Sequence, residues 1–395
     1  MKKFWSDLGV KVSSLKGLAT IGASDIIGNA ISAVFWLYMA SILGAENYGQ
    51  ISYFVAIAGI ASTISLTGAA NTLTVYTAKN VKIESSIYIT SLIITSISAV
   101  IISVIFYNLG ITAYVFGAVI FGLASSEILG KKLYKSYSKY LIVQRLLMWS
   151  LAIGFYHLIG INGVILGLGL AFLPYTFRLY IGFRESKIDF SLLRKYSSVI
   201  THNYMLNLAT TFSGQLDKII IVPILGFVIL GNYQLAIQLV TVLEILPNII
   251  FKFILPHDAT GNSNKKLKKI IILSSIGLAV IGVIVSPVII STFFPKFVPA
   301  IQVFQIASLS VIPSTLGLTI ISKFLGLEKN KLVLISSGVY LAVQITLILL
   351  LGKLYGINGV ATAFVISVSI QTVILLFMDR LVLGVKSNVD NNKHN

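Results

Sequence analysis

Long apolar stretches alternate with short polar segments along the whole chain. Twelve of these stretches hold about 20 mostly apolar residues, the length that a helix needs to cross the hydrocarbon core of a bilayer. They lie at residues 18–43, 49–70, 86–107, 111–130, 140–159, 161–182, 198–225, 231–254, 269–294, 298–322, 331–352 and 357–379. The pattern predicts an all-α, polytopic membrane protein with about 12 transmembrane helices.

The composition agrees with this prediction. The chain has 395 residues, of which 56% are hydrophobic and 11% are charged. In a soluble protein, about a quarter of all residues are charged. The low charged fraction and the excess of apolar side chains here are typical of an integral membrane protein. The first apolar stretch is longer than the core of a signal peptide and lacks a small-residue cleavage pattern, which predicts a retained first span. No cysteine is present, which excludes disulfides and thiolate metal sites.

The net charge of +17 follows the predicted topology. If the N-terminus is cytoplasmic, the segments on the inner side carry 27 of the 30 basic residues, and only Lys218, Lys296 and Lys353 lie on or toward the outside. Excess lysine and arginine on cytoplasmic segments is the known bias of membrane proteins. We therefore expect both termini in the cytoplasm, and the charge gives no reason to expect a nucleic-acid partner.

A short sequence occurs twice, about half the chain apart. "GINGV" stands at residues 160–164 and again at 356–360, each time in the tight outer turn between the fifth and sixth spans of a six-span set. A second echo pairs "ILGAENYGQISYFVAI" from residue 42 with "ILGFVILGNYQLAIQL" from residue 224. Two matches in the same order favour an internal duplication over chance. They predict two pseudo-symmetric six-helix bundles, as in transporters built from parallel repeats.

The expected domain boundaries follow from this duplication. We place an N-terminal six-helix lobe at residues 1–183 and a C-terminal six-helix lobe at residues 199–395. The polar stretch "RESKIDFSLLRKYSS" supplies a cytoplasmic linker at residues 184–198. Two similar bundles can expose a central site to either side of a membrane by rocking, which is how many carriers work.

Polar residues form stripes on three spans. Spacings of three and four residues place such residues on one helical face. The stripes consist of Asn203, Asn207, Thr210 and Asp217 in the seventh span, Gln234, Gln238, Thr241, Glu244 and Asn248 in the eighth, and Asp25 and Asn29 in the first. We interpret them as the lining of a hydrated cavity. The alternative is that they join helices by hydrogen bonds, each of which contributes about 0.6 kcal/mol in a membrane.

Charged side chains within spans are costly in lipid, so they are candidates for function. Arg145 and Arg178 lie near the cytoplasmic ends of the fifth and sixth spans, where they either mark a basic entrance for phosphate or extend to the lipid headgroups. Asp25 and Glu244 lie deeper and are candidates to carry a coupling proton. No phosphate loop, nucleophile motif or spaced histidine cluster is present, so we expect neither an enzyme nor a bound cofactor or metal.

The chain resembles the polysaccharide-repeat-unit flippases, the O-antigen and capsule translocases of the multidrug/oligosaccharidyl-lipid/polysaccharide (MOP) exporter superfamily. The resemblance covers nearly the whole chain in length and number of spans. Its motifs are "SILGAENYGQISYF" at 41–54, "QLDKIIIVPILG" at 215–226, "LGNYQLA" at 230–236 and "LPNIIFKFILP" at 246–256.

The resemblance implies movement of an undecaprenyl-pyrophosphate-linked oligosaccharide across the bacterial inner membrane by alternating access, as in lipopolysaccharide or capsule synthesis. It implies a cationic cavity and a coupling proton or sodium ion. By position, the candidates for binding the pyrophosphate are Arg145, Arg178, Lys218 and Lys252. Two alternatives are a cation-coupled drug or metabolite antiporter of the same superfamily and a membrane-embedded polysaccharide polymerase. The short outer loops argue against the polymerase.

Overall fold

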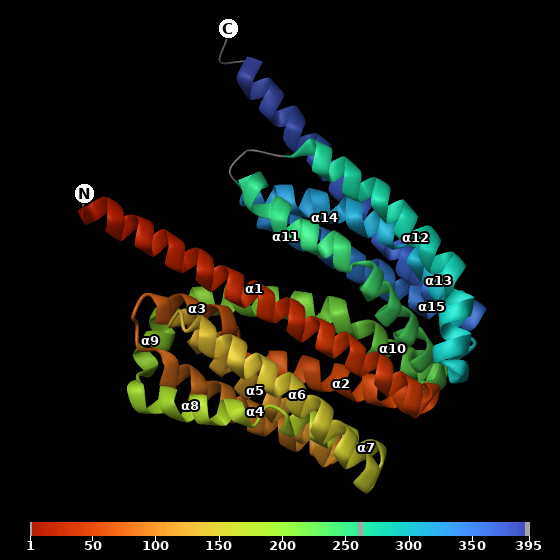
Figure 1. Ribbon diagram of the computed structural model, residues 1–395, viewed down its shortest axis with the longest axis horizontal. Helices are drawn as coiled ribbons and strands as arrows, with labels where there is room; N and C mark the ends of the chain where they lie inside the picture. Colours follow the sequence, from red (N-terminus) through yellow and green to blue (C-terminus); the bar gives the residue numbers. More distant parts are fainter. Residues whose placement is uncertain (1, 260–263, 392–395) are drawn as a thin grey trace. The chain divides into compact units, whose positions relative to one another are not determined.

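The computed structural model of the protein describes residues 2–259 and 264–391, and every regular element in this part is helical. Figure 1 shows the helices as coiled ribbons, coloured from the N-terminus to the C-terminus. They divide into two compact units, which consist of Met1–Trp36 with Phe54–Thr211, and of Leu37–Tyr53 with Phe212–Asn395. We call these unit 1 and unit 2.

Nine helices begin in the first half of the chain. They are α1 (Lys2–Leu43), α2 (Ala45–Leu66), α3 (Ala69–Ala78), α4 (Glu84–Phe106), α5 (Leu109–Gly130), α6 (Tyr134–Ile159), α7 (Ile161–Leu170), α8 (Pro174–Glu185) and α9 (Phe190–Lys195). The second half contains α10 (Ser197–Leu243), α11 (Ile245–Ala259), α12 (Lys265–Phe293), a 3₁₀ turn (Pro295–Phe297), α13 (Ala300–Ser308), α14 (Val311–Gly326) and α15 (Asn330–Asn391).

The helices confirm the predicted fold class. Within the described residues, nine helices are long and apolar enough to cross a membrane, and there are ten if the bent pair α13 and α14 forms one span. Two of the nine, α10 and α15, each contain a glycine with non-helical backbone, Gly226 or Gly356, at which two helices meet. Each of these two helices therefore supplies two membrane crossings instead of one. The ten candidate crossings thus become twelve, the number that the sequence predicts. The predicted second span continues beyond a break at Gly68 (φ 74°) into α3.

The repeated "GINGV" has the same geometry at both places. Its first glycine has a positive φ, 68° at Gly160 and 58° at Gly356, which L-residues other than glycine adopt rarely. Its second glycine faces a backbone carbonyl of the preceding helix. A Cβ atom would lie 2.1 Å from the Phe155 oxygen at Gly163 and 1.9 Å from the Leu351 oxygen at Gly359. Each copy thus reverses the chain and packs two helices at a distance that only glycine allows.

The asparagines of the two copies also have equivalent roles. Asn162 accepts a hydrogen bond of 2.9 Å from Asn108, which caps the N-terminus of α5. Asn358 donates a hydrogen bond of 2.9 Å to Gln302 in α13. In each half, the start of the sixth span is therefore joined to the start of the fourth.

The second echo forms a reciprocal contact inside unit 2. Gly44 and Gly226 both have positive φ, 76° and 83°, and a further glycine follows each of them after five residues. A Cβ atom on Gly49 would lie 2.0 Å from the Phe227 oxygen, and one on Gly231 would lie 1.8 Å from the Ala45 oxygen. The start of α2 and the second part of α10 therefore touch backbone to backbone.

These contacts explain why the units exchange short segments relative to the predicted lobes. Residues 37–53 group with unit 2 because the start of α2 packs against α10. The first turns of α10 group with unit 1, since a Cβ on Gly68 would lie 2.4 Å from the Ile200 oxygen. The predicted division into residues 1–183, 184–198 and 199–395 remains a prediction.

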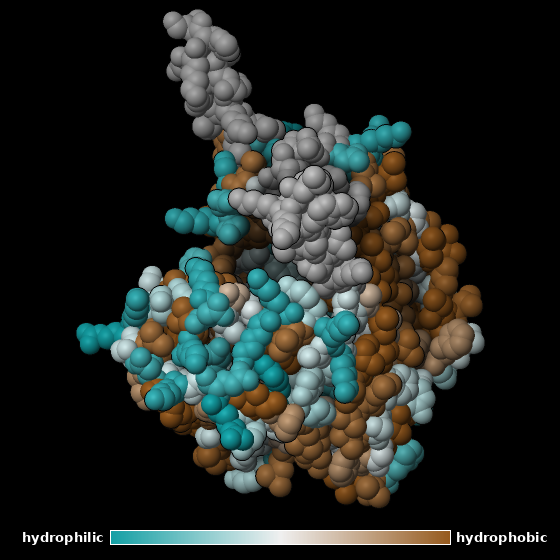
Figure 2. Space-filling model, turned by 60° about the vertical axis from the view of Figure 1, so that its left-hand side comes forward, coloured by the Kyte–Doolittle hydropathy of each residue, from teal (hydrophilic) through white to brown (hydrophobic). Residues whose placement is uncertain are grey.

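Apolar packing fills the interior of unit 1, and polar groups gather at one end of it. A buried cluster includes Leu73, Tyr76, Ile83, Tyr88 and Leu123, contributed by α3, the loop before α4, α4 and α5. Figure 2 views the end of unit 1 at which α3, α8 and α9 lie, and hydrophilic residues cover much of it beside a hydrophobic flank. Such a polar cap above apolar walls is typical of a bundle that ends at a membrane surface.

Candidate functional site

The structure brings two predicted residues of unit 1, Asp25 and Arg145, close together. Tyr137 in α6 donates a hydrogen bond of 3.0 Å to Asp25 in α1. The Arg145 guanidinium lies two turns further along α6, within electrostatic range of Asp25 and of Tyr137. Gly28 lets the helices approach here, because a Cβ would lie only 3.3 Å from Leu141 and 3.8 Å from the Arg145 Nε atom.

Arg145 keeps binding capacity that this contact does not use. The hydroxyl groups of Tyr114 and Tyr175, from α5 and α8, also lie within electrostatic range of its charge. Its Nε atom is buried and has no hydrogen-bond partner among the described residues. An unsatisfied donor on a buried cation is costly, so this is the predicted anion-binding residue with the clearest need for a ligand. Asn29 lies one turn beyond Asp25 on α1 and is exposed.

The polar stripe of the seventh span contacts α3 within unit 1. Asn203 donates a hydrogen bond of 3.1 Å to Thr72, and Asn207 accepts one of 3.4 Å from Asn71. Thr210 bonds to the carbonyl groups of Leu206 and Asn207 in its own helix. Two members of the stripe thus join helices, which is the alternative that the sequence left open. Their place in a substrate cavity remains a prediction.

Asp217 and Lys218 form a local cluster in unit 2. The Asp217 carboxylate accepts hydrogen bonds from the Tyr233 hydroxyl, at 3.2 Å, and from the Lys218 backbone N–H, at 2.8 Å. The Lys218 ammonium donates to the carbonyl of Gly214 at 2.6 Å and to Gln215 at 3.2 Å. Lys218 is therefore held mainly by its own helix. The side chain of Lys252 lies outside the described residues.

The stripe of the eighth span follows the second part of α10 into α11. Thr241 and Asn248 bond to carbonyl groups one turn earlier, at 2.9 Å each. Glu244, at the junction of the two helices, interacts with Ser314 of α14. A buried oxygen of Gln234 has no partner within the described part of the chain, and Gln238 lies one turn further on, half-buried. It remains a prediction that these residues share one cavity with those of unit 1.

Arg178 belongs to an ion-pair network that the sequence did not predict. Its guanidinium donates two hydrogen bonds, of 3.0 and 3.1 Å, to the fully buried carboxylate of Glu127. Lys131 bonds to the same carboxylate at 2.5 Å and forms a second ion pair with Glu185. Arg178 is thus occupied by a bidentate partner. One feature of the sequence could have indicated this network. Glu127 and Lys131 are four residues apart, and residues at this spacing meet on one helical face.

The pKa of Lys131 reflects this network. Burial lowers the pKa of the Lys131 ammonium, but hydrogen bonds to Glu127 and Glu185 outweigh burial, so the pKa is raised above its ordinary value. A raised lysine pKa stabilises the fold at every pH below the unfolded value, and this contribution is lost as the pH rises through the folded value. Lys131 is therefore charged at neutral pH.

A bound metal has no evident site in the described part of the chain. No group of three or more histidine, aspartate or glutamate side chains is placed there to hold a metal ion. The charged groups that do lie close together are ion pairs of opposite sign, such as Asp258 with Lys268 at 2.7 Å. These pairs hold polar groups in place inside the bundles.

The fold and these buried charges define a class, a multi-pass helical membrane protein built as two related bundles with ionisable residues inside its helices. Residues 14–134 match the model of a family described as "Polysaccharide biosynthesis protein". No curated protein matches the chain in sequence.

Several solved structures share the fold. The lipid II flippase MurJ, in an inward closed conformation, matches with a TM-score of 0.76 and 13% identity over 91% of this chain and 87% of that one. An inward-facing multidrug resistance MATE family transporter of the MOP superfamily gives 0.73 and 12% over 94% and 99%. A MOP superfamily transporter from Pyrococcus furiosus gives 0.62 and 14% over 93% and 96%. The resemblance found in the sequence is confirmed, and the chain has the fold of this superfamily.

Proposed function

We propose that the protein is a flippase that moves undecaprenyl-pyrophosphate-linked oligosaccharide repeat units across the bacterial inner membrane by alternating access, with both termini in the cytoplasm. The observation that carries the proposal is the match of residues 14–134 to a polysaccharide biosynthesis family within a chain that has the MOP fold. We would not expect a drug transporter of the same fold to match the model of a polysaccharide biosynthesis family.

The chemistry of unit 1 supports a substrate with a pyrophosphate group. Of the four candidate cations, Arg178 is paired with Glu127 and Lys218 bonds to its own helix. The side chain of Lys252 lies outside the described residues. Arg145 is our first choice, because its buried Nε is unpaired among the described residues. A guanidinium matches phosphate oxygens in bidentate geometry, whereas an ammonium acts as a point charge.

Aromatic side chains beside Arg145 suit the sugar part of such a substrate. Trp149 lies one turn further along α6, and its ring is 5.5 Å from Phe35 in an edge-to-face arrangement. Its indole N–H donates to the Ile31 carbonyl at 3.3 Å, which fixes the ring. A fixed aromatic face contributes large apolar contact at little entropic cost, and the hydroxyl groups of a sugar then bond to polar neighbours such as Asn29.

The experiment is complementation of a deletion strain with variants of Arg145. We expect Arg145→Gln to lower surface glycan at least about tenfold, with untranslocated lipid-linked units accumulating in the inner leaflet, because a charge-assisted bond contributes about 1.5–3 kcal/mol. Arg145→Lys keeps the charge but loses the bidentate geometry, so we expect partial activity. The matched control is Arg184→Gln, since Arg184 is exposed at the end of α8 over the Tyr180 ring.

The competing function is that of a cation-coupled antiporter, which the MATE structures of the same fold favour. Normal surface glycan and unchanged lipid-linked pools in the deletion strain, together with altered dye efflux, would establish the antiporter and refute our proposal. All variants are compared at equal amounts of protein in the membrane, so that a folding defect is not mistaken for lost transport.

A further inference from the structure

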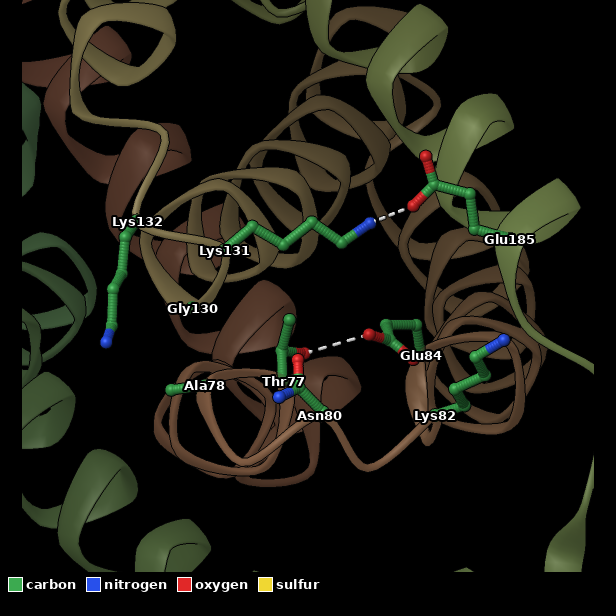
Figure 3. Close-up of a pocket in the computed structure, with 9 residues that line it drawn as sticks. All are labelled: Thr77, Ala78, Asn80, Lys82, Glu84, Gly130, Lys131, Lys132 and Glu185. Carbon is green, nitrogen blue, oxygen red and sulfur yellow. Dashed lines mark hydrogen bonds and ion pairs between the residues drawn. The ribbon is translucent and has the colours of Figure 1, made fainter.

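A polar cavity of about 350 Å³ opens at the end of unit 1 where α3, α5 and α8 stop and α4 begins. Its walls include Asn80, Lys82, Glu84, Lys131, Lys132 and Glu185. In Figure 3, Lys131 extends toward Glu185 and Thr77 lies against Glu84, while Lys82 and Lys132 stand on opposite sides. None of these residues belongs to the site proposed for transport.

Glu84 supplies the first reason to expect a ligand. Its side chain lines the cavity although the residue is only 6% exposed. One carboxylate oxygen, Oε1, accepts a hydrogen bond of 3.1 Å from Thr77. The other, Oε2, is buried and has no partner among the described residues. Since an unsatisfied buried carboxylate oxygen is costly, a donor from a ligand would satisfy it.

The lysines are used unequally. Lys131 is bound to Glu127 and Glu185, and Lys82 lies within electrostatic range of Glu185. Lys82 and Lys132 are both exposed, and neither forms an ion pair within the described part of the chain; Lys132 lies on the other side of the cavity from Glu185 (Figure 3). The cavity therefore has an unpaired acceptor at one side, Glu84, and an unpaired cation at the other, Lys132, with the exposed amide of Asn80 also in its wall.

This distribution of charge selects the class of ligand. A simple anion would meet Lys132 but would be repelled by Glu84 and Glu185. A metal cation would meet Glu84 but also three lysines, and no cluster of metal ligands exists among the described residues. A zwitterion with an ammonium group and a phosphate group satisfies both sides. The ammonium must carry N–H donors, because a quaternary ammonium cannot satisfy a buried oxygen by hydrogen bonding.

The equivalent place in unit 2 gives an internal comparison. There, Asp258 accepts hydrogen bonds from Lys268 on both of its oxygens, at 2.9 and 2.7 Å, and from Ser322 at 2.7 Å. Both oxygens of this carboxylate are therefore paired within the described residues, in contrast to Oε2 of Glu84 in unit 1.

We infer that this cavity binds a phosphoethanolamine group, with its primary ammonium donating to Oε2 of Glu84 and its phosphodiester beside Lys132 and Asn80. A membrane supplies this chemistry as the headgroup of phosphatidylethanolamine, and the cavity lies at the ends of membrane-crossing helices, where headgroups lie. The site is a headgroup site in unit 1, separate from Asp25 and Arg145.

The test uses the purified full-length protein and short-chain phospholipids in detergent, with the lipid-dependent rise in melting temperature as the measure of affinity. We expect the ethanolamine lipid to bind about tenfold or more tightly than the choline lipid, with the monomethyl and dimethyl lipids between them, because each methyl group removes a donor. Glycerophosphoethanolamine, which has no acyl chains, is the competing soluble probe. If glycerophosphoethanolamine competes as strongly as the ethanolamine lipid itself, the ligand is a soluble phosphoethanolamine compound. If it competes more weakly, the ligand is the lipid. Both results support the inferred chemistry.

Two variants test the residues. Glu84→Gln should abolish the preference for ethanolamine over choline, and Lys132→Gln should weaken both lipids alike. The matched controls are Glu328→Gln and Lys331→Gln, which remove the same charges from exposed positions of unit 2. Equal binding of ethanolamine and choline lipids by the unmodified protein, or tighter binding of phosphatidylglycerol, would overturn the inference without any variant. So would a preference that survives in Glu84→Gln.

Discussion

The reciprocal glycine contact in unit 2 can be tested by replacing Gly231 with alanine. A Cβ atom on Gly231 would lie 1.8 Å from the Ala45 oxygen and 2.7 Å from the Ala45 carbonyl carbon. These neighbours are backbone atoms of α2, so a side-chain rotation cannot relieve the clash. The start of α2 must therefore move away from the second part of α10, or the substituted chain does not pack.

The size of the effect follows from the distances. Carbon and oxygen atoms in close contact are normally about 3.3 Å apart, so the two helices must separate locally by about 1.5 Å. Overpacking of this kind typically destabilises a protein by about 1–3 kcal/mol, and a backbone clash belongs at the upper end. Gly49→Ala should act in the same way, because its Cβ would lie 2.0 Å from the Phe227 oxygen. Since both substitutions separate the same helices, the double variant should lose less than the sum of the two.

The assay is the folded fraction that remains after heating detergent-purified protein at one fixed rate, since membrane proteins often unfold irreversibly. The control is Gly277→Ala in α12, where a Cβ would meet nothing within 4 Å. Alanine there should stabilise the helix by up to about 1 kcal/mol. A melting temperature of Gly231→Ala as high as that of Gly277→Ala would refute the contact and, with it, our explanation of the second sequence echo.

Three further outcomes are expected. Glu127→Gln leaves two cations without their carboxylate and should destabilise the fold by about 3–5 kcal/mol, seen as a loss of folded protein that Arg178→Met partly restores. Asp189 caps α9, and hydrogen bonds from the hydroxyl and N–H of Ser191 lower its pKa. Asp189→Ala should therefore lower the melting temperature at neutral pH, and the difference should vanish as the pH falls through that lowered pKa, while Asp189→Asn behaves like the parent at neutral pH. Because the chain has no cysteine, Tyr107→Cys and Lys187→Cys should react with an impermeant thiol reagent from opposite sides of the membrane, and labelling from one side would refute the topology.

The helical architecture could be predicted from the sequence because it depends on length, polarity and glycine. Crossing a membrane requires about 20 apolar residues, so the spans are visible as runs of letters. The two "GINGV" turns were predictable for a similar reason. Their glycines are required by a positive φ at Gly160 and Gly356 and by close packing at Gly163 and Gly359, and these constraints act on the local sequence.

The partners of the polar residues could not be predicted in the same way. A stripe of asparagines has the same spacing whether it lines water or joins helices, and only the structure shows Asn203 bonded to Thr72. The sequence leaves Arg178 either as a cation for phosphate or as a side chain that extends to the headgroups, because its carboxylate partner, Glu127, lies 51 residues away in the sequence. Pairing across such a distance is a property of how α5 packs against α8, which a helical period does not encode.

Ion pairs join equivalent spans in the two halves of the chain. Glu127 and Arg178 join the fourth and sixth spans of the first half, and Lys323 and Asp379, 2.5 Å apart, join the fourth and sixth spans of the second half. Breaking the pair of the fully buried Glu127 carboxylate costs about 3–5 kcal/mol, whereas the partly exposed pair of Lys323 and Asp379 contributes less. Against this shared pattern, the two halves differ in one respect. Both oxygens of Asp258 are satisfied in unit 2, whereas one oxygen of Glu84 in unit 1 has no partner among the described residues. A duplicated fold has no structural need for this difference, and a bound ammonium group at unit 1 provides a physical reason for it.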